Sequence, residues 1–161
     1  SKAESGGCNS TSVATGFSSL AINSGIRSIA ATTSEMSEAI NVANESIAAS
    51  TERNSAAKNS GIQSAAVSTG SSSIAKNTGT HSIAVSTGDE SEAIVSGGQS
   101  VAISIGWRSK AKGALGCWLV LAECRSKEVI DVKSTQVDGD RIKVNTFYRL
   151  KNGEFVECKG M

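Results

Sequence analysis

A nine-residue repeat, S-x-A-x-x-x-G-x-x, constrains this chain more than any other feature of its sequence. Serine stands at every ninth position from Ser1 to Ser109, and alanine follows two residues later in every unit but one. Glycine follows six residues after the serine in most units, although Ser34, Ala43 and Glu52 replace it in the middle of the chain. A strict short period of this kind predicts a solenoid, in which each unit packs against its neighbours.

A second rhythm of eighteen residues predicts how the repeats form coils. Asparagine stands four residues after the serine in alternate units, and serine or threonine takes this place in the units between them. The asparagines are Asn23, Asn41, Asn59 and Asn77. Two nonapeptides therefore make one coil, with one strand on each side of a flattened parallel β-roll, and equivalent residues stack above one another.

Alternation along each strand predicts which side chains face inward. The repeat serine, the alanine and the Asn/Ser/Thr position share one side, whereas the positions between them include many lysines and glutamates that a thin core cannot bury. We expect the serine hydroxyls to bond along their own column and the asparagines to form an amide ladder. We expect the repeat glycine to end each strand by allowing a tight turn.

The outward positions divide into two unlike faces. One face mixes charged and apolar residues, as in the pairs Glu38/Ile40 and Ile74/Lys76, whereas the other carries no charge. A contiguous apolar stripe on the outside of a soluble rod predicts an interface, here between copies of the chain. The alternative is that the C-terminal segment folds back over the stripe. The predicted interface residues are Val13, Ile29, Ile47, Val67, Ile83, Val85, Val101 and Ile103.

The segments Ser82-Ile83-Ala84-Val85 and Ser100-Val101-Ala102-Ile103, the latter followed by Gly106, resemble the head repeats of trimeric autotransporter adhesins. The resemblance covers residues 1 to about 112. In that family such aliphatic residues line a three-fold axis, so the resemblance implies a homotrimer. The family's repeat unit is shorter, which implies a wider coil in this chain.

After Ser109 the repeat ends and large aromatic residues appear. We expect two domains, a β-roll over residues 1–112 and a small antiparallel β cap over residues 113–161. The cap is expected to contain strands at 117–123, 128–136, 141–150 and 154–159, with hairpin turns at Asp138-Gly139 and Asn152-Gly153. This segment is similar to the ends of uncharacterised repeat proteins of gut bacteria and their prophages, which carries no known activity. The candidate cap or binding residues are Trp107, Arg108, Trp118 and Tyr148.

Residues with catalytic or metal-binding potential form no recognisable motif. The single histidine, His81, falls at an expected turn, and the many serines are explained by the period, so nucleophilic catalysis has little support. The acidic patch of Asp89, Glu90 and Glu92 is expected to be a solvated edge. We therefore expect no enzyme activity, no cofactor and no metal site. Regular outward threonines at 15, 33, 51, 69 and 87 leave open an ice-binding array.

The four cysteines form no C-x-x-C pair, which disfavours zinc. Cys124 and Cys158 lie at opposite ends of the expected cap and are candidates for a disulfide, which would indicate export, whereas free thiols would fit a cytosolic protein. The net charge of +1 with scattered lysine and arginine disfavours nucleic acid, and no run is long enough to span a membrane. The chain begins in repeat register without Met, so further repeats or another domain are expected before it.

Together these features predict a non-enzymatic, homotrimeric, adhesin-like or phage-fibre-like β-roll on a cell surface or a virion. Its turns and cap would meet an unknown surface receptor. The alternative is an intracellular, prophage-encoded protein that binds a small molecule or a host protein in clefts between subunits.

Overall fold

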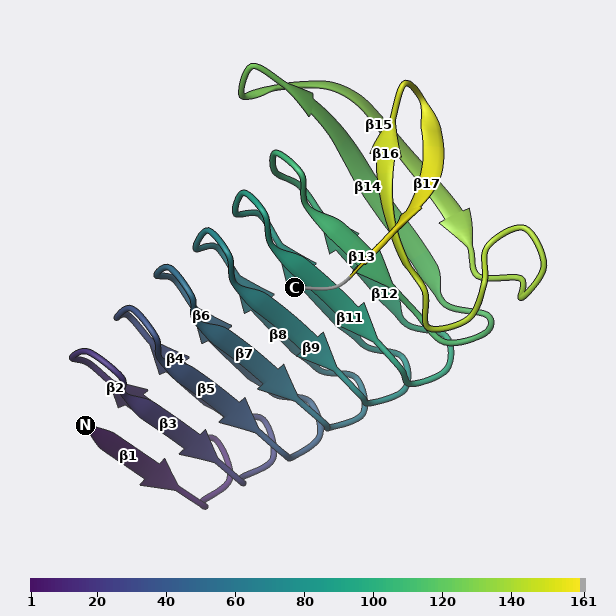
Figure 1. Cartoon of the computed structure of the whole chain (residues 1–161). Coiled ribbons are helices and arrows are strands. Elements are labelled where there is room, and N and C mark those ends of the chain that lie inside the picture. Colours follow the sequence, from purple (N-terminus) through teal and green to yellow (C-terminus); the bar gives the residue numbers. More distant parts are fainter. Residues whose placement is uncertain (160–161) are drawn as a thin grey trace.

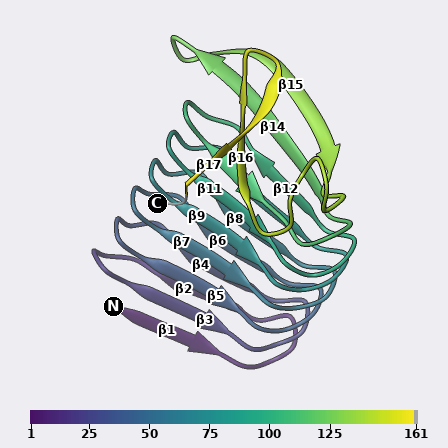
Figure 2. The ribbon, with the colours of Figure 1, turned by 45° about the vertical axis from the view of Figure 1, so that its right-hand side comes forward.

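A computed structural model describes residues 1–159 as an all-β solenoid with two facing sheets (Figures 1 and 2). Sheet A has the strand order β1 (Lys2–Ser5), β3 (Leu20–Asn23), β5 (Glu38–Asn41), β7 (Ala56–Asn59), β9 (Ile74–Asn77), β11 (Glu92–Val95), β13 (Lys110–Lys112), β16 (Phe147–Lys151) and β17 (Glu154–Cys158). Sheet B has the order β15 (Glu128–Gln136), β14 (Trp118–Arg125), β12 (Val101–Ser104), β10 (Ile83–Ser86), β8 (Ala65–Ser68), β6 (Ile47–Ser50), β4 (Ile29–Thr32) and β2 (Thr11–Ala14).

The pairing register confirms the predicted coil of two nonapeptides. In sheet A, Ala57 of β7 pairs with Ala75 of β9, eighteen residues later, and the strands are parallel. In sheet B, Ala66 of β8 pairs in the same way with Ala84 of β10. Each coil therefore contributes one strand to each sheet, and equivalent residues form columns along the stack.

The core consists of small side chains, as the alternation predicted. The repeat alanines from Ala21 to Ala111 are fully buried, and the repeat serines from Ser19 to Ser109 are buried beside them. Small side chains allow the two sheets to approach closely, and larger ones would force them apart.

The repeat serines tie neighbouring coils together through the backbone. The Ser46 amide donates to Oγ of Ser64 in the next coil at 3.1 Å, and Oγ of Ser46 donates to the carbonyl of Asn44 at 2.8 Å. Oγ of Ser19 also donates to Oγ of Ser37 at 3.1 Å. The predicted bonding along the serine column is therefore present, mostly as amide-to-hydroxyl bonds between coils.

The asparagines do not form the expected amide ladder. Nδ2 of Asn77 donates to the carbonyls of Ser64 at 2.9 Å and Ile83 at 3.2 Å, and Oδ1 of Asn77 accepts the amide of Gly79 at 2.9 Å. Backbone groups of the turn and of the opposite sheet thus use both ends of the amide. The asparagine column satisfies polar backbone inside the roll and does not bond to itself.

The expectation for the repeat glycine was wrong in its physical reason. The backbone turns at the residue just before each repeat serine, which is never glycine and has φ near 55°, as at Gln63 (φ 55) and His81 (φ 54). Glycine is needed for a close approach instead, because a Cβ on Gly79 would overlap the carbonyl oxygen of Gly61 in the preceding coil. Stacking of coils therefore requires glycine at Gly79, whereas Gly16 has open space at its Cβ position and a φ of 101°, so backbone freedom matters there.

The C-terminal strands are antiparallel, as expected, but they do not form one separate sheet. Strand β14 continues sheet B by pairing in parallel with β12, and β15 then pairs antiparallel with β14. Strand β16 continues sheet A by pairing antiparallel with β13, and β17 pairs with β16. The cap is therefore two hairpins, each of which extends one sheet of the roll (Figure 1).

One strand boundary and one turn in the cap differ from the sequence prediction. The strand expected at 141–150 is limited to Phe147–Lys151. Asp138-Gly139 is not a hairpin turn, because β15 and β16 belong to different sheets, and Oδ1 of Asp138 instead accepts the amides of Asp140 and Ile142. The Asn152-Gly153 hairpin is confirmed, with positive φ at both residues (51° and 74°).

Larger side chains fill the space where the two hairpins leave the roll. They are buried together at the end of the alanine core. They are Leu119, Leu121, Val137, Ile142, Tyr148 and Leu150. The large apolar residues that mark the end of the repeat thus close the core at this end.

Candidate functional site

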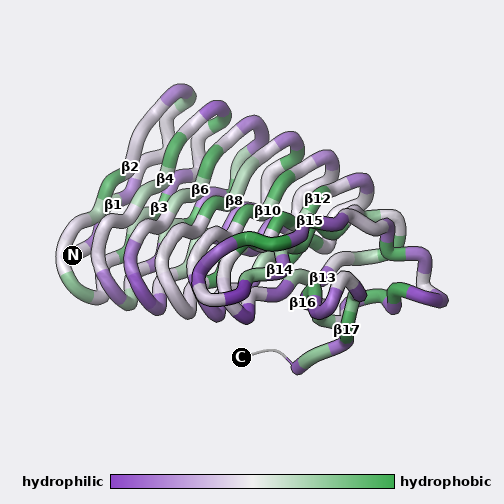
Figure 3. Tube along the Cα trace, turned by 90° about the horizontal axis from the view of Figure 1, so that it is seen from above, coloured by the Kyte–Doolittle hydropathy of each residue, from purple (hydrophilic) through white to green (hydrophobic). Residues whose placement is uncertain are grey.

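The outward side of sheet B is a continuous apolar surface. The parallel register places Ile29, Ile47, Ala65, Ile83 and Val101 in one row, and Val13, Ala31, Ala49, Val67, Val85 and Ile103 in the next. The eight predicted interface residues all lie in these two rows, which we call the apolar face. Figure 3 shows hydrophobic segments that recur along the labelled strands of sheet B.

Side chains of the apolar face are open to solvent in the single chain. Val13 is 50% exposed, Ile47 is 42% exposed, and Ile29 and Ile83 are each 40% exposed. The C-terminal segment within residues 1–159 does not cover them, since β14 extends the sheet and does not fold across it. The alternative of a self-covered stripe is therefore excluded for the described chain.

The apolar face continues onto the cap, although the nine-residue repeat did not predict this continuation. Trp118 pairs with Val101, and Val120 pairs with Ile103, so both outward rows extend by one strand. Trp118 is 45% exposed. The separation between Val101 and Trp118 is seventeen residues and not eighteen. Allowing one deleted residue in the last coil would have revealed the continuation.

The outward side of sheet A has a different character, because opposite charges pair across neighbouring strands. Lys58 of β7 pairs with Glu38 of β5, and Nζ of Lys110 lies 3.4 Å from Oε1 of Glu92. Nζ of Lys112 lies 4.4 Å from the ring centroid of Phe147, a cation–π contact. This face is suited to water, and its contrast with the apolar face makes the roll two-sided.

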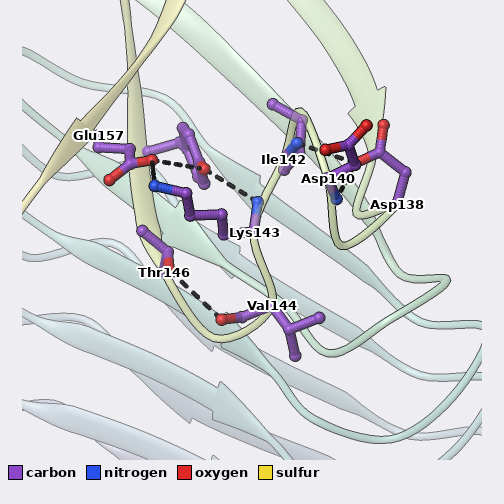
Figure 4. A network of polar contacts seen from close by, with 8 residues as sticks. Asp138, Asp140, Ile142, Lys143, Val144, Thr146 and Glu157 are labelled. Carbon is purple, nitrogen blue, oxygen red and sulfur yellow. Dashed lines mark hydrogen bonds and ion pairs between the residues drawn. The ribbon is translucent and has the colours of Figure 1, made fainter.

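Tyr148, one of the predicted cap or binding residues, is only 2% exposed and therefore contributes to packing. Its hydroxyl accepts the amide of Lys143 at 2.9 Å and lies 3.4 Å from Oε1 of Glu157. Nζ of Lys143 lies 2.7 Å from the same carboxylate (Figure 4). The hydrogen bond from Lys143 lowers the pKa of Glu157 below its usual value, and the same bond raises the pKa of Lys143.

A carboxylate of sheet B joins the two cap hairpins. Oε2 of Glu123 in β14 accepts the amide of Gly153 at 2.9 Å, and Gly153 is in the turn of the other hairpin. Backbone hydrogen bonds from Gly153 and Asn152 lower the pKa of Glu123. This contact holds the ends of the two hairpins together, although they belong to different sheets.

The other two candidates, Trp107 and Arg108, lie in the turn between β12 and β13. The Arg108 guanidinium lies 5.0 Å from the Trp107 ring centroid, and Nη1 of Arg108 lies 3.6 Å from Oε1 of Glu90. The preceding turn holds this one, because the Trp107 amide donates to Oδ1 of Asp89 at 2.8 Å. Both side chains are exposed beside the cap.

The remaining titratable residues are dispersed. His81 is exposed in a turn, and within residues 1–159 no group of three or more His, Cys, Asp or Glu side chains has the arrangement to hold a metal ion. All four cysteines are free, so the candidate pair of Cys124 and Cys158 forms no disulfide. Among the described residues, no helix is long and apolar enough to span a membrane.

Comparisons with protein-family models, with curated proteins and with solved structures found no match to this chain.

Proposed function

We propose that this chain is a non-enzymatic β-roll that assembles as a homotrimer and presents its turns and cap to a surface target, in the manner of an adhesin head or a phage fibre. The observation that supports assembly is the apolar face. Its two rows on sheet B bear no charge, whereas the outward side of sheet A carries ion pairs between neighbouring strands. Burial of each Ile or Val side chain between copies contributes about 1.5 to 3 kcal/mol before the costs of association.

Three copies are favoured because the apolar face is a narrow stripe along a rod. Only two outward side chains per strand contribute to it, so stripes from three rods can meet around a common axis. The turns then point away from that axis on the narrow edges of each roll, where side chains vary between units and are free for recognition.

The test replaces Ile47 and Ile83 together by lysine and measures mass in solution by light scattering coupled to size exclusion. Wild type is expected at three times the 16.4 kDa of one chain, and the double variant at 16.4 kDa. The matched control replaces Ile40, which pairs with Lys58, and Ile74, which pairs with Glu92, by lysine on sheet A and should remain trimeric. Equal mass for wild type and the Ile47/Ile83 variant contradicts the proposal, and a wild-type mass of two chains replaces the trimer by a dimer.

A second candidate is the intracellular, prophage-encoded protein that binds a small molecule or host protein between subunits. The four free cysteines favour it, because thiols stay reduced in the cytosol. The full-length gene distinguishes the two: an export signal with a membrane anchor supports the first candidate, and a phage regulatory neighbourhood without export supports the second.

A further inference from the structure

Two open cavities meet where the last coil joins the cap, and Arg108 and Arg149 line both of them. The first has a volume of about 350 Å³ and includes Trp107 in its wall. The second has a volume of about 330 Å³ and includes Lys110 and Lys159. Both volumes fall in the range of about 300 to 1,000 Å³ that is typical of small-molecule sites.

The cavities arise because the regular turn stacking ends here. In earlier coils the residue with positive φ donates its amide to the coil above, as Ser72 does to Asp89 and Glu90 does to Trp107. Within the described residues, Arg108 makes no such bond, because the chain above it has departed into the β14–β15 hairpin. The turn of Trp107 and Arg108 is thus the last of its column and remains uncovered.

Arg149 is the unusual group at this junction. Its Nε is buried, and among residues 1–159 it has no hydrogen-bond partner. A buried donor without an acceptor destabilises the folded protein, and the effect is larger where the group is charged. Arg149 therefore lowers the stability of the empty site, and it lies in β16, where it lines both cavities.

Neighbouring cations increase that cost. The antiparallel pairing of Ala111 with Tyr148 places Lys110 directly opposite Arg149 on the outward side of sheet A. Like charges at directly opposed positions repel. Glu90, which lines the second cavity, forms an ion pair with Arg108, and Glu92 forms one with Lys110.

We propose that this junction binds an anion through a carboxylate or phosphate group, with Arg149 as its main contact and with Arg108 and Lys110 on either side. A guanidinium can donate two parallel hydrogen bonds to either kind of oxyanion, and the negative charge of the anion would offset the repulsion between Arg149 and Lys110. Trp107, which is 41% exposed, offers its ring to the uncharged part of the ligand. Cys158 does not compete as an anion, because burial raises the pKa of its thiol despite the nearby charges of Lys110 and Arg149.

The first experiment titrates the full chain with glucuronate and, separately, with inorganic phosphate at low ionic strength. Two-dimensional NMR of arginine Nε–H groups follows Arg149 directly, and saturable movement of its signal is expected with at least one of the two anions. Binding of glucuronate alone identifies a carboxylate ligand, and binding of phosphate alone identifies a phosphate ligand. If neither anion moves the Arg149 signal up to about 10 mM, the proposal is overturned, because that limit corresponds to under 3 kcal/mol of binding.

The second experiment uses charge-removing variants with a matched control. Arg149→Gln and Arg108→Gln are each expected to weaken binding about tenfold or more, as the loss of a charge-assisted hydrogen bond does. Arg108→Gln should fold normally, because Gln63 and Gln99 already occupy the equivalent turn position with the same positive φ. Arg27→Gln removes the same charge from an equivalent turn at the other end of the roll and should bind like wild type.

Equal binding by the Arg149→Gln and Arg27→Gln variants would show that only overall charge attracts the anion, and it would overturn the proposal. Circular dichroism of each variant confirms that the fold is retained. The site lies within one chain, so this inference goes beyond the proposed assembly and does not depend on it. The Ile47/Ile83 lysine variant should bind the anion even after it has lost the trimer, which separates failure of one proposal from failure of the other.

Discussion

The asparagine column allows a sharp test of how the roll is held together, through the replacement Asn77→Ala. Asn77 is fully buried, and its amide makes three hydrogen bonds to the backbone. After the replacement the Ser64 carbonyl still accepts the amide of Ile83, but the Gly79 amide loses its only acceptor among residues 1–159. One orphaned amide, two lost bonds and the small cavity together should lower the free energy of unfolding by about 3 kcal/mol.

Ser86→Ala is the matched comparison. Ser86 stands at the corresponding place in the opposite strand and is equally buried, yet its Oγ has no hydrogen-bond partner within the part of the chain that the structure describes. Removal of this hydroxyl breaks no bond, so the free energy of unfolding should change by less than about 0.5 kcal/mol or should rise. The pair of variants separates loss of a bonded polar group from loss of side-chain volume.

Guanidinium unfolding followed by circular dichroism measures both variants, and a loss of about 3 kcal/mol corresponds to a fall in Tm of about 9 °C for a chain of this size. Hydrogen exchange at the Gly79 amide should accelerate in Asn77→Ala and stay unchanged in Ser86→Ala. Equal unfolding midpoints for the two variants would refute the reasoning, because polar satisfaction by Asn77 would then contribute nothing that an unpaired hydroxyl does not.

Two further predictions concern the turns and the cap. Gly79→Ala should destabilise the roll by several kcal/mol, since the new Cβ overlaps the Gly61 carbonyl, whereas Gly98→Ala meets open space and should be nearly neutral; thermal unfolding of both variants is the check. The Lys143 hydrogen bond lowers the pKa of Glu157, so the ionised carboxylate stabilises the fold above its unfolded pKa and this contribution is lost as the pH falls through the lowered value. The fall in Tm between about pH 7 and about pH 3 should therefore be smaller for Glu157→Gln than for wild type, and an equal fall in both would contradict this role.

The roll was predictable because the same pattern of residues recurs in every coil, so each structural preference appears many times in the sequence. Lysine and glutamate alternate with small residues along each strand, and this alternation identified the small residues as the buried side. The eighteen-residue spacing of Asn41 and Asn59 identified the length of one coil. Contacts within a column could not be read in the same way. Sequence spacing places Asn59 below Asn77, but the backbone acceptors that compete for their amides appear only in three dimensions.

The cap was less predictable because its residues occur once. Nothing in the sequence indicated that β15 and β16 would join different sheets. The turn of the first hairpin is Ser126-Lys127, with φ of 51° and 69°, and lacks the glycine or asparagine that usually marks such a turn. The basic junction at Arg149 was likewise hidden, because Arg149, Lys110 and Arg108 converge only when β16 pairs with β13.

The positive-φ position before each repeat serine accepts many residue types, whereas the tightly packed interior accepts few. Residues as different as Arg27, Met36, Glu45 and His81 adopt the same backbone angle there. Each narrow edge therefore carries a column of exposed side chains at intervals of about 4.8 Å, and their identity can vary while the backbone stays the same. Single substitutions at these turn positions can therefore change the surface of the rod while the alanine and serine core stays unaltered.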